Sequence, residues 1–599
     1  MNKTAIKNYA VWARSELIER VSQKAFQYGI SETTLPELNT ESINGNLLSK
    51  EEKNQLNECI TVISKQKKTI LEGQKKKNEQ EALSQAFYHI MEEVAYTWFN
   101  RFIALRFMEV NNYLPQKVKV FTNGYNEFKP EILKEAIYLD IENLDKEKVS
   151  TLMDENKEEE LYKYLLLTLC NDMNQYLPEM FTSIKDYKTL LFPDNLLRED
   201  SILDKLVKDI PEEDWTEQVQ IIGWLYQYYN SELKDLVMKK KNYTKDDIPA
   251  ATQLFTPDWI VRYMTENSLG RLWIDGHPDF NHDEWKYYLE EAQQEPNVIE
   301  QLNKIKEEHA KLNPEDIKVI DPCMGSGHIL VYAFEVLMDI YRDCGYTDRD
   351  AAQSILENNL YGLEIDERAY HLAYFSLMMK ARSYNRRILS KRIELNLVEI
   401  KESEEINLDS LEEHKELAQH LIETFKEAKE YGSILILDCK EQELRELQEY
   451  LNNIDLEDYT DLIGQDEKKK LVENLKPLVK QALLLTQKYD VVITNPPYMA
   501  PSPKQKPYVL KHYKNYKTDL FAIFQKKCKE LTIKNGYQAM IVLPSFLFLS
   551  SFENARKELL NNQTICSLLH MGRGIFGIDF GSTSFVLINA SIKNYNGKY

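Results

Sequence analysis

The stretch YDVVITNPPY, residues 489–498, decides the fold of the second half of this chain. Its first six residues, Tyr489–Thr494, are rich in β-branched side chains and predict a buried strand. Two prolines cannot continue a central strand, so the chain must leave the sheet after Asn495. Asn495 is therefore expected at the carboxyl end of a strand, where open α/β sheets bind their ligands. Asn-Pro is also an ordinary turn signal, so the motif needs support from elsewhere in the chain.

That support comes from DPCMGSG, residues 321–327, which follows a predicted strand at 317–320 and opens a predicted helix. Gly325 and Gly327 carry no Cβ, so the backbone can approach a ligand closely, and the helix N-terminus favours a carboxylate or phosphate. A dinucleotide fingerprint would have a third glycine where this chain has Leu330, so hydride transfer is not indicated. The alternative for this segment alone is an ordinary tight turn.

Strands alternate with helices from about residue 248 onward, which predicts a doubly wound sheet. Further strands are expected at residues 360–366, 393–400, 536–543, 565–571 and 584–588. Glu364 lies near the end of the second of the core strands. Two charged helical insertions, at about 278–314 and 401–488, interrupt the pattern because they are too long for simple connections. Before the first of them, Thr256 is a natural N-cap and Pro257 a natural first residue for the helix that follows.

The first 245 residues have helical periodicity, little glycine and poor strand alternation. We therefore expect an all-α domain over residues 1–245 and an α/β domain over 246–599. Pro193-Asp194 followed by Glu232-Leu233-Lys234 superficially matches a metal-nuclease signature, but such triplets are common and this one falls in a helical run. A nuclease is not expected.

Composition limits the class of protein further. A chain of 599 residues is too long for one core, and it has no run of about twenty apolar residues and no signal-peptide pattern. The seven cysteines are scattered without metal-ligand spacing, so a cytoplasmic, reduced, metal-free protein that is not in a membrane is expected.

The formal net charge of −21 argues against a protein coated in nucleic acid, but a DNA enzyme needs only a local basic surface. Residues 504–534 provide one candidate, with nine lysines, two acidic residues and the interleaved Tyr508, Tyr513 and Tyr516. Its position after Asn495 favours a loop that contacts phosphates, with a plain solvated surface as the alternative.

The residue types at 495–498 suit methylation of an exocyclic amine. The lone pair of adenine N6 is delocalised into the ring, so this nitrogen is a poor nucleophile. The Asn495 side-chain oxygen and the Pro496 carbonyl can each accept one N6–H hydrogen bond, which draws the nitrogen toward tetrahedral geometry. Tyr498 can stack on a base swung out of the duplex, although a core tyrosine is as plausible from sequence.

Four segments in order, residues 252–257, 321–327, 361–366 and 495–498, resemble the motifs of gamma-class N6-adenine DNA methyltransferases. The resemblance implies a Rossmann-like class I sheet and S-adenosylmethionine (SAM) as cofactor. It implies catalytic roles for Asn495, Pro496, Pro497 and Tyr498. It also implies cofactor-binding roles for Thr256 at the methionyl carboxylate, for Asp321, Pro322, Gly325 and Gly327 around the methionine moiety, and for Glu364 at the ribose. No metal is implied.

Two further positions stay open within this resemblance. The acidic residue that contacts the cofactor adenine is Glu399 or Asp438, and the aromatic residue near the last strand is Phe580 or Phe585. The N-terminal segments 8–17 and 221–229 are in addition similar to the PglX-type methyltransferases of bacteriophage-exclusion (BREX) systems. Members of that family are about twice as long, so the C-terminal target-recognition half is expected to be absent here.

The sequence therefore predicts a SAM-dependent N6-adenine DNA methyltransferase module of a phage-defence system, with double-stranded DNA and other defence proteins as partners. Two alternatives remain at this point. The Asn-Pro-Pro-Tyr motif also resembles that of enzymes that methylate a protein side-chain amide. A SAM-binding scaffold subunit of a defence complex is the non-enzymatic alternative.

Overall fold

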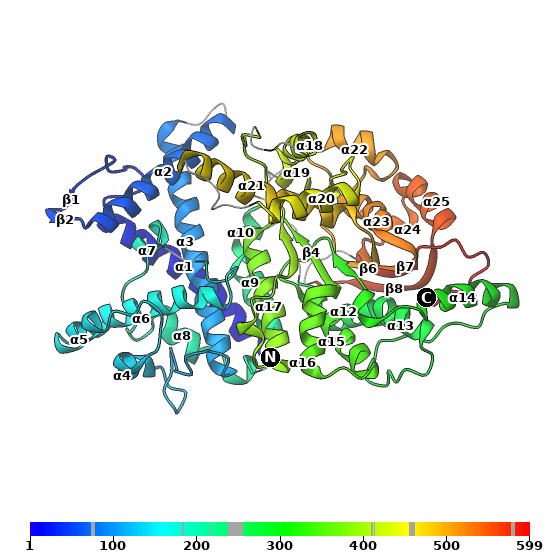
Figure 1. The fold of residues 1–599 in the computed structure, drawn as a ribbon, viewed down its shortest axis with the longest axis horizontal. Coiled ribbons are helices and arrows are strands. Elements are labelled where there is room, and N and C mark those ends of the chain that lie inside the picture. The colour runs from blue at the N-terminus through cyan, green and yellow to red at the C-terminus, as the bar shows by residue number, and fades with distance from the viewer. Residues whose placement is uncertain are drawn as a thin grey trace. The chain divides into compact units, whose positions relative to one another are not determined.

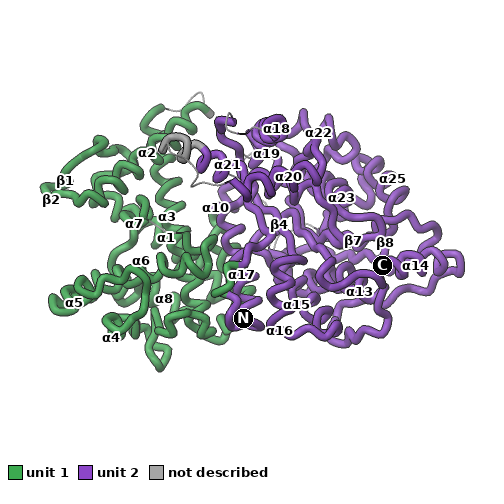
Figure 2. The backbone as a smooth tube through the Cα atoms, in the orientation of Figure 1, with its two compact units in different colours: residues 1–232, 389–392 green, residues 233–388, 393–599 purple. Residues whose placement is uncertain are grey.

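The computed structural model describes residues 1–73, 78–182, 185–216, 218–237, 255–408, 411, 414–454, 462–576 and 581–599, with only the backbone for residues 73 and 462–467. The chain forms two compact units (Figure 2). The first contains Met1–Glu232 and Leu389–Arg392, and the second contains Leu233–Ile388 and Ile393–Tyr599. The predicted boundary near residue 245 lies outside the described residues.

The first unit is helical, as expected, apart from a short hairpin. Its elements are α1 Lys3–Gln27, β1 Ser42–Ile43, β2 Asn46–Leu47, α2 Lys50–Gly73, α3 Glu79–Val110, α4 Glu131–Glu135, α5 Lys146–Asp154, α6 Glu158–Asp172, α7 Tyr187–Leu190, α8 Ile202–Lys208, α9 Gln220–Tyr229 and the start of α10 Ser231–Val237. Helix α3 is apolar on most sides and lies in the core, where α1 and α2 pack against it. Asp194 and Glu232, from the nuclease-like triplet, form ion pairs with lysine and arginine side chains.

The second unit is built on a seven-stranded sheet (Figure 1). Its strands are β3 Val319–Asp321, β4 Leu360–Glu364, β5 Asn396–Glu399, β6 Tyr489–Thr494, β7 Thr532–Val542, β8 Thr564–Arg573 and β9 Gly581–Ile588. The order in space is β5-β4-β3-β6-β7-β9-β8. The first five strands are parallel, and β9 inserts antiparallel between β7 and β8. The predicted Rossmann-like class I sheet is therefore confirmed.

Strand order reverses at β3, because the chain adds β4 and β5 on one side and β6 and β7 on the other. Such a switch point leaves a crevice at the carboxyl ends of the two central strands. The glycine-rich turn follows β3 and the Asn-Pro-Pro-Tyr motif follows β6, so the topology brings both motifs to this crevice.

Helices cover both faces of the sheet. Helices α15 His328–Asp343 and α17 Glu367–Tyr384 pack on β3, β4 and β5, and α12 Asp258–Thr265 packs on β7 and β9. The other helices and turns before β6 include α13 Arg271–Gly276, α14 Pro296–His309, α16 Asp348–Ser354, α18 Lys415–Phe425, α19 Ala428–Tyr431, η9 Gly432–Ile434, α20 Glu441–Asn452 and α21 Leu462–Thr486. Those after β6 are α22 Lys506–His512, η10 Lys514–Tyr516, α23 Leu520–Leu531, α24 Ser545–Phe548, η11 Ser550–Phe552 and α25 Glu553–Asn562.

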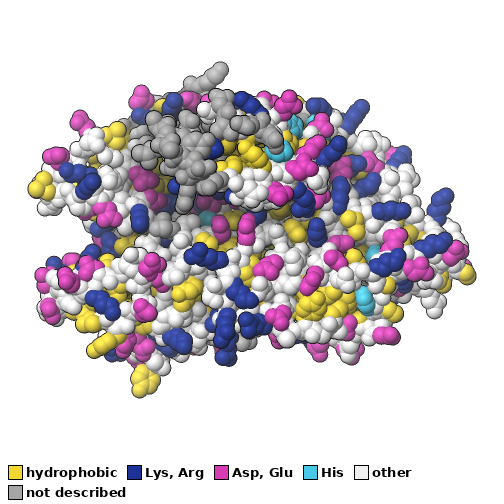
Figure 3. All heavy atoms as spheres, in the orientation of Figure 1, with side chains coloured by type: hydrophobic (Ala, Val, Ile, Leu, Met, Phe, Trp, Pro, Cys, Tyr) yellow, Lys and Arg dark blue, Asp and Glu magenta, His cyan; other side chains and the backbone are white. Residues whose placement is uncertain are grey.

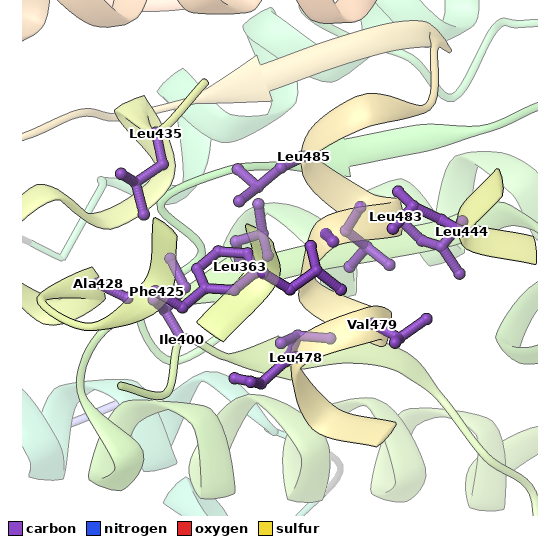
Figure 4. Close-up of a cluster of buried hydrophobic side chains, with 14 of the residues drawn as sticks. Leu363, Ile400, Phe425, Ala428, Leu435, Leu444, Leu478, Val479, Leu483 and Leu485 are labelled. Carbon is purple, nitrogen blue, oxygen red and sulfur yellow. The ribbon is translucent and has the colours of Figure 1, made fainter. Parts of the chain in front are cut away.

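The insertion predicted at 401–488 is part of the core. Figure 4 shows Leu363 of β4 and Ile400 after β5 in one buried cluster with Phe425 of α18 and with Leu478 and Leu483 of α21. These side chains are buried and apolar, so the insertion supplies the helical layer on this face of the sheet. Removing it would expose that face to water.

The insertion predicted at 278–314 is helical only in its second half, so that prediction was partly wrong. Helix α14 covers Pro296–His309, while residues 277–295 form turns and extended chain. Trp285 explains the difference, because its ring packs on Gly270 and its Nε1–H donates to Asp339 at 3.1 Å. A long-range anchor of this kind overrides the local helical periodicity.

Candidate active site

Asn495 emerges from the carboxyl end of β6 and is held by two side chains. Its Nδ2 donates to Thr256 Oγ1 at 3.0 Å, and Tyr498 donates its hydroxyl to Asn495 Oδ1. The ring of Tyr498 also lies 6.3 Å from that of Phe521 on α23. The structure thus brings together one predicted cofactor residue, Thr256, and two predicted catalytic residues, Asn495 and Tyr498. Thr256 and Asn495 are 239 positions apart in the sequence.

Thr256 is not the helix N-cap that the sequence predicted. Helix α12 begins at Asp258 with Pro257 in the cap position and no side-chain cap. The hydroxyl of Thr256 accepts from Asn495 instead, in a buried position. Threonine is a residue type that favours the N-cap position, but here its hydroxyl binds Asn495, a residue far away in the sequence.

The glycine-rich turn leaves β3 and enters α15 with two left-handed residues. Gly325 has φ +53° and Gly327 has φ +82°. A Cβ at Gly325 would meet no heavy atom within 4 Å, whereas one at Gly327 would lie 3.0 Å from Ala373 Cα. Gly325 therefore faces open space suited to a ligand, and Gly327 allows close packing of the turn on α17.

Asp321 connects the two motif-bearing strands. Its Oδ1 accepts from Thr494 Oγ1 at 2.7 Å and from the Cys323 N–H at 2.9 Å. The residue is 1% exposed, and burial raises the pKa of its carboxyl to about 7. Asp321 thus fixes the start of the glycine-rich turn against the end of β6. Thr494 has a role in the site that the sequence reasoning missed, although its place directly before Asn495 offered a signal.

Glu364 lies at the carboxyl end of β4, on the rim of the same crevice. Its Oε2 accepts from the Gly325 N–H at 2.8 Å, and its Oε1 accepts from the backbone N–H groups of Ile365 and Asp366 at 2.9 and 3.0 Å. Burial raises the pKa of this carboxyl to about 7 despite those donors. Two carboxyl groups whose pKa lies near neutrality therefore flank one turn.

Of the two acidic candidates left open, Glu399 lies beside Glu364 in the register of β5 and β4. Its carboxylate is buried and accepts from Lys429 Nζ at 2.7 Å. Asp438 is exposed on the connection that follows η9. Of the two aromatic candidates, Phe585 is buried in the core, so it cannot stack on a base without repacking, and Phe580 lies outside the described residues.

A segment of the insertion, residues 428–436, contacts both motif regions, and no local sequence pattern indicates this contact. Ser433 Oγ donates to the Pro322 carbonyl of the glycine-rich turn at 2.6 Å. On the other side, Gln505 donates its amide to the Glu430 carbonyl at 2.6 Å, and the Tyr513 hydroxyl donates to the Ile434 carbonyl at 2.7 Å. The segment therefore links the turn after β3 to the loop after β6.

The lysine- and tyrosine-rich stretch is only partly the surface that was expected. Tyr513 and Tyr516 are buried, so they cannot stack on nucleic acid bases. Lys527 is also buried, donates to the Leu435 carbonyl at 2.8 Å, and has its pKa lowered to about 8 by that burial. Lys526 forms an ion pair with Glu558 at 2.7 Å. Four lysines of α22, η10 and the turn after it remain exposed and form no ion pair within the described residues: Lys506, Lys511, Lys514 and Lys517.

Within the described ranges, no group of three or more His, Cys, Asp and Glu side chains could hold a metal ion. No helix among the described residues is long and apolar enough to cross a membrane.

Comparison with known proteins gives matches at two levels. Two family profiles match the second unit: "Eco57I restriction-modification methylase" over residues 358–576 and "N-6 DNA Methylase" over residues 297–408. The whole chain is 36% identical to the adenine-specific methyltransferase BrxX of Escherichia coli O9:H4 (strain HS) and 34% identical to the adenine-specific methyltransferase PglX of Lacticaseibacillus casei (strain Zhang).

These alignments cover 100% of this chain but 51% and 52% of the relatives, so the chain spans about half the length of the curated relatives that it matches. Among solved structures, a complex of DrdV with DNA matches at 12% identity and a TM-score of 0.39, covering 90% of this chain and 42% of that chain.

Proposed function

This chain is a homologue, along its whole length, of the adenine-specific methyltransferases BrxX and PglX, and from this we propose that it is the methylation module of a phage-defence system. The reaction is transfer of a methyl group from SAM to N6 of an adenine swung out of double-stranded DNA. The matches to adenine-specific methyltransferases and to an N-6 DNA methylase profile favour DNA over a protein amide as the substrate.

The observation that carries the proposal is the fixed amide of Asn495. Its nitrogen donates to Thr256, so its oxygen is turned toward the Tyr498 side of the site. An amide oxygen has two lone pairs, and the Tyr498 hydroxyl takes one of them. The other can accept an N6–H from adenine, while the Pro496 carbonyl accepts the second N6–H. These two acceptors bind the two amine hydrogens and direct the nitrogen lone pair toward the methyl donor, and the methylated nitrogen then loses one of these protons to water.

The residues present fit SAM. Open space above Gly325 accommodates the methionine moiety without a side chain in the way. The N-terminus of the 16-residue helix α15 and the Thr256 hydroxyl are suited to its carboxylate, and Glu364 is suited to the ribose hydroxyls. When bound, SAM supplies a methyl group already activated by a positive sulfur. Asp321, Pro322 and Gly327 would shape the turn that holds the methionine moiety.

DNA as a partner is supported by the position of the four exposed lysines. Residues 506–517 directly follow the catalytic motif, so cations there can hold the phosphates on either side of the target nucleotide. Sequence recognition is not assigned to this chain, which spans about half of its relatives, and the other defence proteins remain proposed partners.

The decisive experiment compares methylation in a host carrying the complete defence system with either the wild-type gene or Asn495→Ala. N6-methyladenine is quantified by mass spectrometry and mapped by long-read sequencing. Loss of the Asn495 acceptor should lower methyl transfer by about 10²- to 10³-fold, the usual effect of removing one transition-state hydrogen bond. Asn562→Ala on α25, an exposed asparagine, is the matched control and should have no effect.

Calorimetry with SAM shows whether the variant retains its cofactor site, because the cofactor turn follows a different strand. If Asn495→Ala methylates like wild type, the proposed catalytic role is wrong. If neither the wild type nor the control methylates DNA although both bind SAM, the chain is a SAM-binding scaffold and not an enzyme. Phage resistance measured in the same strains tells whether defence depends on the methylation.

A further inference from the structure

Three consecutive apolar side chains are exposed at the carboxyl end of β7. Leu547, Phe548 and Leu549 are 36%, 69% and 45% exposed. Isolated exposed apolar residues are common, but a run of three on one turn is costly in water without a partner. We name Leu547–Leu549 the apolar turn.

The apolar turn is held rigidly from below. Phe546 and Phe552, on either side of it, are buried in one aromatic cluster, with their rings 5.7 Å apart. Arg556 of α25 donates through Nη1 to the carbonyl groups of Phe546 and Leu549 at 2.8 and 2.7 Å. The exposed side chains are therefore presented on a fixed backbone, as a rigid contact requires.

The same cluster supports the catalytic motif. Tyr498 contacts Phe521 at 6.3 Å between ring centroids, and Phe521 contacts Phe546 at 6.1 Å. Strands β6 and β7 are parallel neighbours with Thr494 in register with Met540, so the segments that follow them leave the same edge of the sheet. The apolar turn and the catalytic motif thus stand on one edge over a shared core.

Two cationic residues lie on the segment that contacts η11, the turn that directly follows the apolar turn. The segment η10 packs on α23 and α25, and the Thr518 hydroxyl donates to the Ser551 carbonyl at 3.4 Å. This contact places the turn that carries Lys517 beside η11. Lys514 and Lys517 are exposed and form no ion pair in the part of the chain that is described.

We propose that the apolar turn inserts into the base stack of double-stranded DNA next to the target adenine, while Lys514 and Lys517 contact the flanking phosphates. The inference rests on the proposed function and adds to it the means by which the base is extruded. Apolar side chains that wedge between base steps unstack them, and lysines beside the wedge hold the backbone. This combination of a rigid apolar tip and unpaired cations complements DNA.

The test uses the whole chain and two fluorescent 30-base-pair duplexes of identical sequence, one intact and one with a single abasic site. An abasic site removes the stacking that the wedge must break, so the wild type should bind that duplex about tenfold more tightly. Phe548→Ala should lose most of this preference yet keep the same salt dependence of binding. Phe548→Leu should keep part of it. Leu47→Ala, an exposed apolar residue of the first unit, is the control and should behave as wild type.

An unchanged preference for the abasic duplex in Phe548→Ala, or no preference in the wild type, would overturn the wedge. If, in addition, Phe548→Ala changes the mass of the protein in sedimentation, the apolar turn is a protein interface and not a DNA contact. Host methylation is measured separately with the same variants. If the wild type methylates DNA but Phe548→Ala keeps the full preference for the abasic duplex, the wedge is refuted and the proposed function is not. If the wild type does not methylate DNA, the proposed function is refuted.

Discussion

Asn495 keeps its amide in one orientation because Thr256 accepts from its nitrogen. Thr256→Val replaces the hydroxyl by a methyl group of similar size and leaves that nitrogen without its acceptor. We expect kcat to fall about tenfold, since a lost hydrogen bond that leaves a buried group unpaired costs about 1–3 kcal/mol. Thr256→Ser, which retains the hydroxyl, should recover most of it. Single-turnover rates at saturating SAM separate this effect from weaker cofactor binding, and equal rates for Val and Ser would contradict it.

The two carboxyl groups near the glycine-rich turn predict a pH dependence. Burial raises the pKa of Asp321 and of Glu364 to about 7, so both groups become ionised as pH rises through neutrality. The folded chain then binds more protons than the unfolded chain between about pH 4 and 7, and these two groups make folding less favourable as pH rises through that window. A cationic ligand favours the ionised forms, so SAM affinity should rise from pH 6 to 8.

Calorimetry in buffers of different ionisation enthalpy should accordingly detect proton release when SAM binds at pH 7. S-adenosylhomocysteine is the control, because it shares the amino acid and nucleoside parts but lacks the positive sulfur. Its affinity should depend less on pH. An identical pH dependence for the two ligands would contradict the assignment of these carboxyl groups.

Among the elements, the turn between β3 and α15 contains two glycines whose substitution should have different effects. Gly327→Ala places a Cβ 3.0 Å from Ala373 in a left-handed conformation, so it should lower the free energy of unfolding by about 1–3 kcal/mol. Gly325→Ala is also left-handed but meets open space, so it should cost about 1 kcal/mol. Gly325→Trp should instead abolish SAM binding by filling that space.

Denaturant unfolding and SAM titration of the Gly325 and Gly327 variants check both halves of this prediction. If Gly325→Trp binds SAM as well as wild type, the open space is not the cofactor site. If Gly327→Ala is as stable as wild type, the packing of the turn on α17 is looser than the distances indicate.

The elements that the sequence predicted are those with strong local signals. The β-branched run before Asn495 and the glycine pair after Asp321 were sufficient to place both motifs at neighbouring strand ends. The insertion of β9 between β7 and β8 was not predictable, because strand periodicity says nothing about pairing order. The roles of Ser433 and Trp285 depend on partners far away in the chain, and Thr256 has a tertiary partner that no local pattern reveals.

On the scale of the whole molecule, the net charge of −21 repels DNA, whereas the local lysines attract it. Acidic and basic side chains are mixed over the face shown in Figure 3. We expect this chain to bind DNA weakly, with little sequence preference and a strong dependence on salt. Replacing the four exposed lysines at 506, 511, 514 and 517 by serine should reduce the log-affinity against log-salt slope by up to about 3.6, at about 0.9 per phosphate contact.

Fluorescence anisotropy of labelled duplexes over a range of salt concentrations measures that slope. Serine at four exposed lysines of the first unit, Lys7, Lys117, Lys134 and Lys146, makes the matched control and should leave it nearly unchanged. A wild-type slope near zero, or tight discrimination between unrelated duplexes, would contradict the electrostatic interpretation.

Strand β3 pairs with β6, which is synthesised much later on the ribosome. Lys318 and Asp490, which join the starts of these strands by a hydrogen bond of 2.8 Å, are 172 residues apart. Strands β3, β4 and β5 are complete within residues 319–399, so the glycine-rich turn and Glu364 leave the ribosome long before the Asn-Pro-Pro-Tyr motif does. Closing so long a loop is slow. The nascent chain therefore already contains the glycine-rich turn and Glu364, the residues proposed to bind the cofactor, while the strand that leads to Asn495 is still being made.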